Sequence, residues 1–580
     1  MKNKTIKRLS AALAATIAVS MAAGCNPSFD DGGKSGVTEI TVQVGSGCCK
    51  NVSYLDAAIE RFMESKKNEV YEDGKQGVSV TAMDPQDLSY DSSMMQYDIL
   101  IGENRTNIYD LQSKGWLHDI SNIVEKFESK IDPDIKERMK GSDGKYYSMP
   151  RHSFYCGISY NVSLFDKYNF YFAADDEEDV NEIDSQFIPA ADGNFTEAGG
   201  KAKLIGSKNA KKSCGPNGVA GDYDDGLPSS VEEFLVLCQY IKEQGINPFA
   251  ISGDGGNYNY GFMLVNAIWS GLVGAEGMKN IYCNWSGTEV EVVKLDASGN
   301  TLLTNEDLFY AGSGIKKPQT EKIVLNDNNG YRMYDMAARY YALGVLQVAY
   351  KNGWFCQDDW DGKSNLATQK DFLYGESNTG NQRKNRSAML FDSSYWYGES
   401  VREGNIADYA RKNPTDPVPH VSIMPMPTAY GGQVAEGEGK KPVLLDIGAS
   451  QLFVSKNVEN NAGKLRAVED FIEFLYSDEE LASFTESTGL QVAMTYDYDA
   501  KKLDEFYDRM KVITDNGVII RPSSANIKYK SAASSFSVSW GGYVNNFNLD
   551  GLDCHDGSLY AMINGKDMRA IFETTRRKTW

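Results

Sequence analysis

Basic residues are in short supply in this chain of 580 residues. Lysine and arginine together number 59 against 80 aspartates and glutamates, and the formal net charge at pH 7 is −21. A protein that binds nucleic acid needs a positive surface to neutralise the phosphates, so this composition argues against a nucleic-acid partner. The acidity indicates little about positive function, because a net charge far from zero mainly keeps a protein soluble and monomeric.

Residues that bind metals or act as nucleophiles are also few and scattered. The chain has four histidines and nine cysteines, and it contains no Cys-x-x-Cys pair. The nucleophile motif G-x-S-x-G and the zinc motif H-E-x-x-H are both absent. The sequence therefore predicts no cofactor, no resident metal and no catalytic residue.

Long apolar runs are missing after the N-terminus. Four basic residues among the first eight precede an apolar run over 9–23, which is too short to span a bilayer comfortably. The small residues directly before Cys25 resemble a bacterial lipobox, although Ala22 stands where leucine is usual. We predict a signal peptide over 1–25, lipidation of Cys25, and a flexible tether over 26–36. Lipidation would anchor the protein to the outer face of the bacterial cytoplasmic membrane; the alternative is a plain secretory signal.

What the chain does contain is a repeated strand–helix pattern. An alternating strand is predicted at 38–44, and apolar residues at helical spacing follow from Leu55 to Phe62 before a second strand at 77–82. Asp98–Ile101 is a third, buried strand that ends in a polar turn before helical spacing resumes at Ile108. This order predicts a layered α/β lobe with a largely parallel sheet. In such sheets small ligands bind beyond the ends of the strands.

Similar elements continue beyond a proline-marked extended segment over 145–161, which we interpret as a crossing between two lobes. Ser230 and Glu233 form a capping box that begins a helix. Buried strands are predicted at 248–252, 387–391 and 444–454. Two segments, 174–226 and 276–330, break the pattern and are interpreted as surface insertions. The acidic start of the first insertion leaves a bound cation as an open alternative.

Five stretches in this order resemble the family 1 extracellular solute-binding proteins of ABC importers: 97–120, 143–168, 227–251, 386–397 and 444–494. The resemblance implies an α/β, two-lobed periplasmic-binding-protein-like fold. Each of the two hinged lobes would be a mostly parallel sheet flanked by helices, and the ligand would bind in the cleft between them. Lobe one would comprise 37–150 and 443–498, and lobe two 155–430 and 499–580. The two insertions depart from the usual, shorter pattern.

A sugar site needs aromatic faces for the ring and fixed polar groups for the hydroxyls. By the resemblance, the ligand-binding candidates are Glu103, Asn104, Arg105, Phe154, Tyr258, Tyr260, Asp392, Tyr395, Trp396 and Trp540. Asn104 and Arg105 match polar sugar-binding positions, and Trp396 matches a stacking tryptophan. For each aromatic the alternative is packing in the core, since tryptophan buries much apolar area anyway.

The implied function is the capture of a carbohydrate, in particular an oligosaccharide, by a monomeric, lipid-anchored protein that delivers it to ABC permease subunits. Two alternatives remain open. A secreted glycan-processing enzyme would also carry aromatics and carboxylates in a cleft, and 80 acidic residues leave room for a catalytic pair. A surface glycan-binding protein or adhesin would have no transporter partner.

Overall fold

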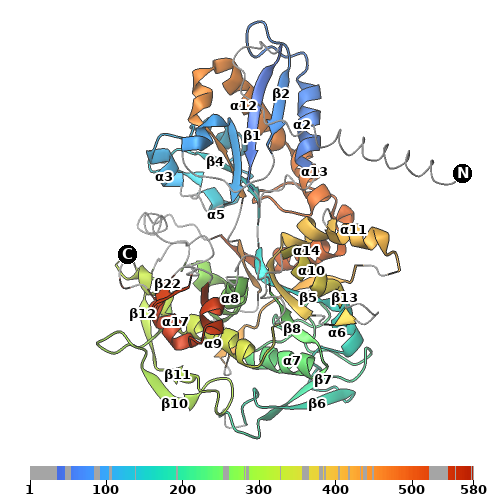
Figure 1. Cartoon of the computed structure of the whole chain (residues 1–580), viewed down its shortest axis with the longest axis vertical. Coiled ribbons are helices and arrows are strands. Elements are labelled where there is room, and N and C mark those ends of the chain that lie inside the picture. The colour runs from blue at the N-terminus through green and yellow to red at the C-terminus, as the bar shows by residue number, and fades with distance from the viewer. Residues whose placement is uncertain are drawn as a thin grey trace, which may run out of the picture.

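Two bodies stacked along the long axis make up the molecule, and each is built around its own β-sheet (Figure 1). The structure is a computed structural model. It describes residues 36–45, 54–83, 92–103, 108–136, 139–153, 155–190, 194–251, 260–279, 281, 287–326, 328–355, 365–377, 383–384, 387–402, 405–415, 418–430, 433–434, 441–446, 450–521, 547–554, 557–576 and 578.

The first sheet has five strands in the order β2-β1-β3-β20-β4. The strands are β1 (Thr38–Val44), β2 (Val78–Ala82), β3 (Ile99–Glu103), β4 (Ser148–His152) and β20 (Ser450–Val454). β1 runs parallel to β2 and β3, whereas β20 runs antiparallel to both of its neighbours, β3 and β4. The three strands predicted from the N-terminal pattern are thus confirmed.

The helices around this sheet are amphipathic. α2 (Tyr54–Ser65) buries Leu55, Ala58, Ile59 and Phe62, the spacing of one helix face. The ring of Phe62 lies 4.9 Å from that of Phe471 on α12. The helices of this body are α2, α3 (Ile108–Ser113), α4 (Ser121–Phe127), α5 (Pro133–Lys136), α12 (Ala462–Leu475) and α13 (Asp478–Thr488).

The second sheet has six strands, five in the order β21-β19-β5-β15-β8, with β16 also paired to β5. They are β5 (Tyr155–Asn161), β8 (Asn247–Ala250), β15 (Ser387–Ser393), β16 (Val421–Met424), β19 (Val443–Asp446) and β21 (Val518–Ile520). Every residue of β5 and β15 is buried, as expected for strands covered by helices on both faces.

Helices cover this second sheet. The capping box predicted at the start of α7 is present: the Ser230 side chain accepts from the Glu233 amide at 3.1 Å, and the Glu233 carboxylate accepts from the Ser229 amide at 2.6 Å. α8 is broken at Gly274, whose φ of 77° is left-handed. The helices are α6 (Val162–Tyr168), α7 (Val231–Glu243), α8 (Gly261–Lys279), α9 (Ala337–Lys351), α10 (Asn365–Tyr374), α11 (Asn405–Lys412), α14 (Glu505–Asn516), α16 (Gly557–Ile563) and α17 (Met568–Thr574).

The single strand predicted at 444–454 is wrong. Val443–Asp446 forms β19 in the second sheet, paired with β5 and β21, and Ser450–Val454 forms β20 in the first sheet. The sequence pattern did not separate them because the residues of both strands are mostly buried. Hence β19, which the predicted boundary at 443 groups with lobe one, belongs to the sheet of the second body.

The two segments interpreted as insertions form hairpins. β6 (Val180–Ser185) pairs with β7 (Gly200–Ile205) in the first of them. The second contains β9 (Glu289–Val293) with β12 (Thr320–Val324), and β10 (Leu303–Asp307) with β11 (Lys316–Pro318). Of these, β6–β7 and β10–β11 lie at the end of the second body away from the first, and β12 lies on its flank (Figure 1). Smaller hairpins pair β13 (Glu376–Ser377) with β14 (Arg383–Lys384), β17 (Ala429–Tyr430) with β18 (Gln433–Val434), and β22 (Phe547–Leu549) with β23 (Leu552–Cys554). Within the described residues, none of the helices has the length and apolar character that a membrane span requires.

Candidate functional site

Strand ends from both sheets meet where the two bodies join. Ser450, the first residue of β20, pairs with Glu103 at the end of β3 on one side and with His152 at the end of β4 on the other. The ring of His152 in turn stacks on that of Tyr395, with centroids 5.7 Å apart and an interplanar angle of 17°. Tyr395 follows β15 of the second sheet. The ends of β3 and β15 carry predicted ligand residues. They are therefore linked by one row of neighbouring residues, which runs Glu103, Ser450, His152, Tyr395.

The side chains at the end of β15 are held in fixed positions. One carboxylate oxygen of the buried Asp392 accepts a hydrogen bond from Gln369 Nε2 at 2.9 Å, and the other accepts from the Ser393 amide at 2.7 Å. The amide of Ser394 donates to the carbonyl of Tyr155 at 3.0 Å, and the amide of Tyr155 donates to Ser394 Oγ at 3.1 Å. These bonds tie the end of β15 to the start of β5, directly after the chain crosses from the first sheet.

Trp396 lies inside the second body and not at its surface. The residue is only 1% exposed, and its indole Nε1 donates to Ser159 Oγ at 2.9 Å. The rings of Phe372 and Phe506 meet the indole edge-on at 5.8 and 5.9 Å. Core packing, the alternative stated for every candidate aromatic, accounts for the surroundings of Trp396 in this conformation. A stacking role would require the ring to become exposed.

Most of the other predicted residues lie outside the described part of the chain. This holds for Asn104, Arg105, Phe154, Tyr258, Trp540 and the predicted lipidation residue Cys25, and also for the side chain of Glu103. Tyr260 is half-buried directly before α8. The ligand-binding roles of these residues stay predictions.

His152 is the titratable group at the centre of the row. Burial, with a smaller effect from the neighbouring Arg151 guanidinium, lowers the pKa of His152 to about 3. Arg151 is itself buried in the first body, where its guanidinium lies 4.6 Å from the ring centre of Phe484 and 5.3 Å from that of Tyr54. The imidazole is therefore neutral near pH 7. It can pack against Tyr395 as an uncharged ring but is a poor proton donor for catalysis.

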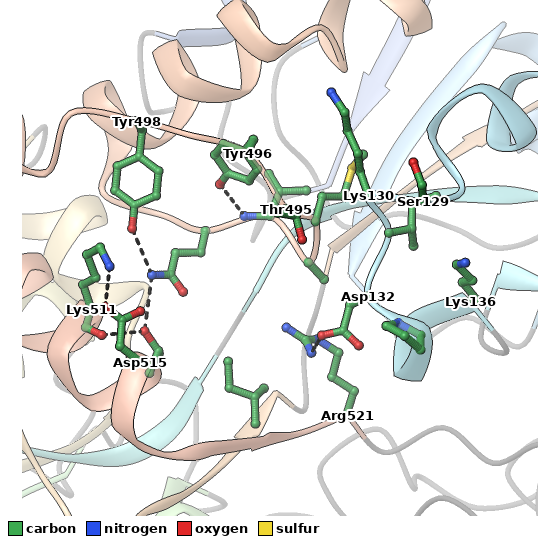
Figure 2. Close-up of a pocket in the computed structure, with 18 of the residues that line it drawn as sticks. Ser129, Lys130, Asp132, Lys136, Thr495, Tyr496, Tyr498, Lys511, Asp515 and Arg521 are labelled. Carbon is green, nitrogen blue, oxygen red and sulfur yellow. Dashed lines mark hydrogen bonds and ion pairs between the residues drawn. The ribbon is translucent and has the colours of Figure 1, made fainter.

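A cavity of about 490 Å³ lies beside the chain crossings (Figure 2). Its described lining comes from 129–136 in the first body, Tyr155, the link 491–498 between α13 and α14, and 511–521 in the second body. The hydroxyl of Tyr155 donates to Gln491 Oε1 at 2.8 Å within this lining. The described lining residues include none of the ten ligand-binding candidates.

An arginine joins the two bodies at this cavity. One guanidinium nitrogen of Arg521 is ion-paired with Asp132 of the first body, as Figure 2 shows, and Nε lies 3.3 Å from Asp446 of the second. The side chain of Arg521 is 5% exposed and that of Asp446 is 0% exposed. Sequence reasoning missed this group, since Asp132 and Arg521 are 389 positions apart. Of the residues at the junction, His152 and Tyr155 lay in the segment that the sequence indicated as a crossing.

Comparisons with known proteins bear on the fold. No protein-family model matches the sequence, and no curated protein matches it. Among solved structures, the chain is similar to BlMnBP1, a binding protein of an ABC transporter from Bifidobacterium animalis subsp. lactis solved with mannobiose (TM-score 0.52, 14% identity, 95% of this chain and 97% of that chain). It is also similar to a chitin oligosaccharide binding protein (TM-score 0.50, 14% identity, 93% of this chain and 100% of that chain). A protein from a study of xylan utilisation by Caldanaerobius polysaccharolyticus gives a TM-score of 0.50 at 12% identity, covering 91% of this chain and 100% of that chain.

At this level of identity, the likeness establishes the fold. The chain has the two-lobed α/β fold of solute-binding proteins, as five stretches of its sequence predicted.

Proposed function

We propose that this protein captures a carbohydrate, in particular an oligosaccharide, between its two bodies and delivers it to the permease of an ABC transporter. The observation that carries the proposal is the extent of the likeness. It covers 95% of this chain and 97% of a transporter binding protein in complex with mannobiose, and 93% of this chain and 100% of a chitin oligosaccharide binding protein. A shared fold over the whole length favours a shared mode of action, although fold alone does not determine function.

The junction of the strand ends supports a binding site there. Asp392 and Tyr395 are already fixed by Gln369 and His152, so polar and aromatic groups would need little reordering to meet a sugar. From the first body, the turn after β3 would contribute hydroxyl-binding groups. The proposed ligand residues remain Glu103, Asn104, Arg105, Phe154, Tyr258, Tyr260, Asp392, Tyr395, Trp396 and Trp540.

Binding without turnover is part of the proposal. The buried histidine of the junction is neutral near pH 7, and the bonds that hold Asp392 suit a fixed acceptor better than a proton shuttle. Lipidation of Cys25 would keep the protein at the outer face of the cytoplasmic membrane, beside the permease. Replacing Cys25 with serine should release the protein from the membrane fraction; unchanged retention would contradict the anchor.

The test uses the protein from residue 26 onward with a panel of mannobiose, chitin oligosaccharides, xylo-oligosaccharides and malto-oligosaccharides. A sugar that binds only the native state stabilises the protein by about 2.7 kcal/mol when its concentration is one hundred times its Kd. The melting temperature of the protein therefore rises. Chromatography of the same samples should recover the sugar intact. Cleaved sugar would contradict binding without turnover, and a response only to peptides or polyamines would reject the carbohydrate.

Variants of the turn after β3 test where the sugar binds. Arg105→Ala should weaken binding at least tenfold, which is about 1.4 kcal/mol, by calorimetry with the sugar from the panel. Lys67→Ala is the matched control, because Lys67 is an exposed cation of the same body that lies just after α2 and pairs with Glu64 of that helix. Equal affinity in both variants would remove Arg105 from the site.

A further inference from the structure

The loop that closes the first insertion gathers three aspartates. Asp222, Asp224 and Asp225 each offer a carboxylate oxygen, and these oxygens all lie within 4.8 Å of one another. Asp222 is exposed, Asp225 is half-buried and Asp224 is 0% exposed. The loop lies directly before Leu227 and α7 in the second body.

Backbone and side-chain amides hold the three carboxylates but do not satisfy them. Asp224 Oδ2 accepts from the Asn217 amide at 3.0 Å, and Asp225 Oδ2 accepts from the Gly221 amide at 2.8 Å. Asp222 Oδ2 accepts from Asn217 Nδ2 at 2.7 Å. The Oδ1 atoms of Asp224 and Asp225 are both buried and have no hydrogen-bond partner among the described residues. Two carboxylate oxygens of the three aspartates therefore have no hydrogen-bond donor among the described residues.

The buried Asp224 also has no ion-pair partner among the described residues, although the ammonium of Lys212 attracts Asp225. Lys211 and Lys212 are the basic residues closest in sequence to the three aspartates. Lys211 is paired with Asp176 at 2.8 Å, and the Nζ atom of Lys212 lies 3.2 Å from the ring centre of Tyr171. In the described part of this insertion, no lysine or arginine forms an ion pair with the three aspartates. A carboxylate buried without a counter-charge costs several kcal/mol, so the folded loop needs a bound cation or a proton at this point.

We infer that Asp222, Asp224 and Asp225 bind a divalent cation of the calcium class. All the groups that converge are oxygens, which are the ligands of hard cations, and a calcium ion accepts such oxygens with water completing its shell. Zinc is disfavoured because the cluster contains no histidine and no cysteine. The exposed side chain of Asp222 leaves a way in for the ion and its waters.

The cation stabilises the loop through which the first insertion returns to the second body. The carbonyl of Asp224 accepts from the Leu227 amide at 3.0 Å, and Gly226 donates to Ser213 and accepts from Phe172, each at 2.8 Å. Gly215 packs so tightly on this turn that a Cβ there would lie 2.1 Å from the Asp224 carbonyl oxygen. An ion at this point fixes the chain that leads into α7. Its role is structural and does not depend on what the junction binds.

The competing account is a proton. Burial, reinforced by Asp222, raises the pKa of Asp224 to about 8, so an ion-free Asp224 holds a proton at neutral pH. That account predicts no response to calcium.

The test uses calcium and terbium on the whole protein from residue 26 onward. We expect one equivalent of Ca²⁺ by calorimetry, displacement by Ca²⁺ of Tb³⁺ that luminesces through Tyr223, and a higher melting temperature in CaCl2 than in EDTA. Asp224→Asn should abolish that equivalent and the calcium-dependent rise in melting temperature. Asp184→Asn removes an exposed carboxylate on β6 of the same insertion and should retain both.

A second variant guards against misfolding of Asp224→Asn. Asp222→Asn changes an exposed side chain and should weaken calcium binding at least tenfold while the protein remains folded. The inference is overturned if the wild type binds no stoichiometric calcium, or if Asp222→Asn and Asp184→Asn bind it equally well. Greater stability of Asp224→Asn without any calcium response of the wild type would establish the proton instead.

Discussion

The two sheets share a plan, and the comparison between them explains the junction. In the first sheet, β20 is antiparallel to β3 and β4 and comes from the far end of the chain. In the second, β5 is antiparallel to β15, β16 and β19. β4 continues into β5, and β19 continues into β20, so each crossing joins a strand of one sheet to a strand of the other. The chain thus crosses between the bodies three times: from β4 to β5, from β19 to β20, and again in the link 491–498 between α13 and α14.

The sheets differ in what surrounds them. The second body carries the hairpins β6–β7, β9–β12 and β10–β11, and β6–β7 and β10–β11 lie at its end away from the first body (Figure 1). The described strands of the first body, by contrast, all belong to its one sheet. Surface loops tolerate insertion when they do not disturb packed elements.

Loss of a large buried aromatic side chain should lower the free energy of unfolding the most. The destabilisation should be confined to the body that contains the side chain. Trp396→Ala in the second body and Tyr476→Ala in the first should each cost about 4 kcal/mol in urea unfolding, because each leaves a cavity and an unpaired polar partner. Trp396 bonds Ser159, and Tyr476 bonds the Pro150 carbonyl at 2.7 Å. Hydrogen exchange should accelerate around β5 and β15 for the first variant and around β20 for the second. Equal acceleration in both bodies would mean that they unfold as one unit.

Removal of the arginine at the junction should have the next largest effect. Arg521→Met leaves Asp446 buried without its counter-charge, and we expect a loss of about 3 kcal/mol in the free energy of unfolding. Adding Asp446→Asn should restore most of it. Lys126→Met breaks an exposed pair with Glu473 on the first body and should change stability by less than about 1 kcal/mol. If Arg521→Met lost as little stability as the control Lys126→Met, the arginine would not hold the two bodies together.

The pH dependence from His152 is the most local effect. The unfolded imidazole takes up a proton near its usual pKa of 6.5, while the folded one stays neutral until about pH 3. Stability is therefore lost as the pH falls from 6.5, by about 1.4 kcal/mol for each pH unit. The variant His152→Gln lacks this pH-dependent loss of stability, and the acidic residues titrate alike in the variant and the wild type. The difference in urea midpoint between the two should change with pH between 6 and 4; a constant difference would contradict a buried, neutral histidine.

Local pattern was sufficient to predict many of the elements, and the resemblance to a known family implied the fold. The spacing from Leu55 to Phe62 predicted the buried face of α2, and Ser230 with Glu233 predicted where α7 begins. Both features depend on neighbours within a few residues. Five such segments in a family order then predicted the two-lobed architecture.

Contacts between distant segments could not be read in the same way. The sequence places Trp396 among polar and aromatic neighbours at a strand end, but it does not reveal that Ser159 and Phe506 enclose the ring. It shows that Asp224 lies in an acidic run, but not that this side chain is the buried one. Burial and pairing of this kind are set by tertiary packing, which a single sequence records only indirectly.

The origin of β20 has a consequence for the order of folding. The first body cannot complete its sheet until residues 450–454 are available, since β20 is the only partner that joins β4 to β3 in the described sheet. Closing a loop of roughly 300 residues carries an entropic cost and slows this pairing. The first residues to be synthesised are thus among the last to become native. The predicted signal peptide implies export, and late completion of this sheet would lengthen the time in which the chain can be exported before it folds.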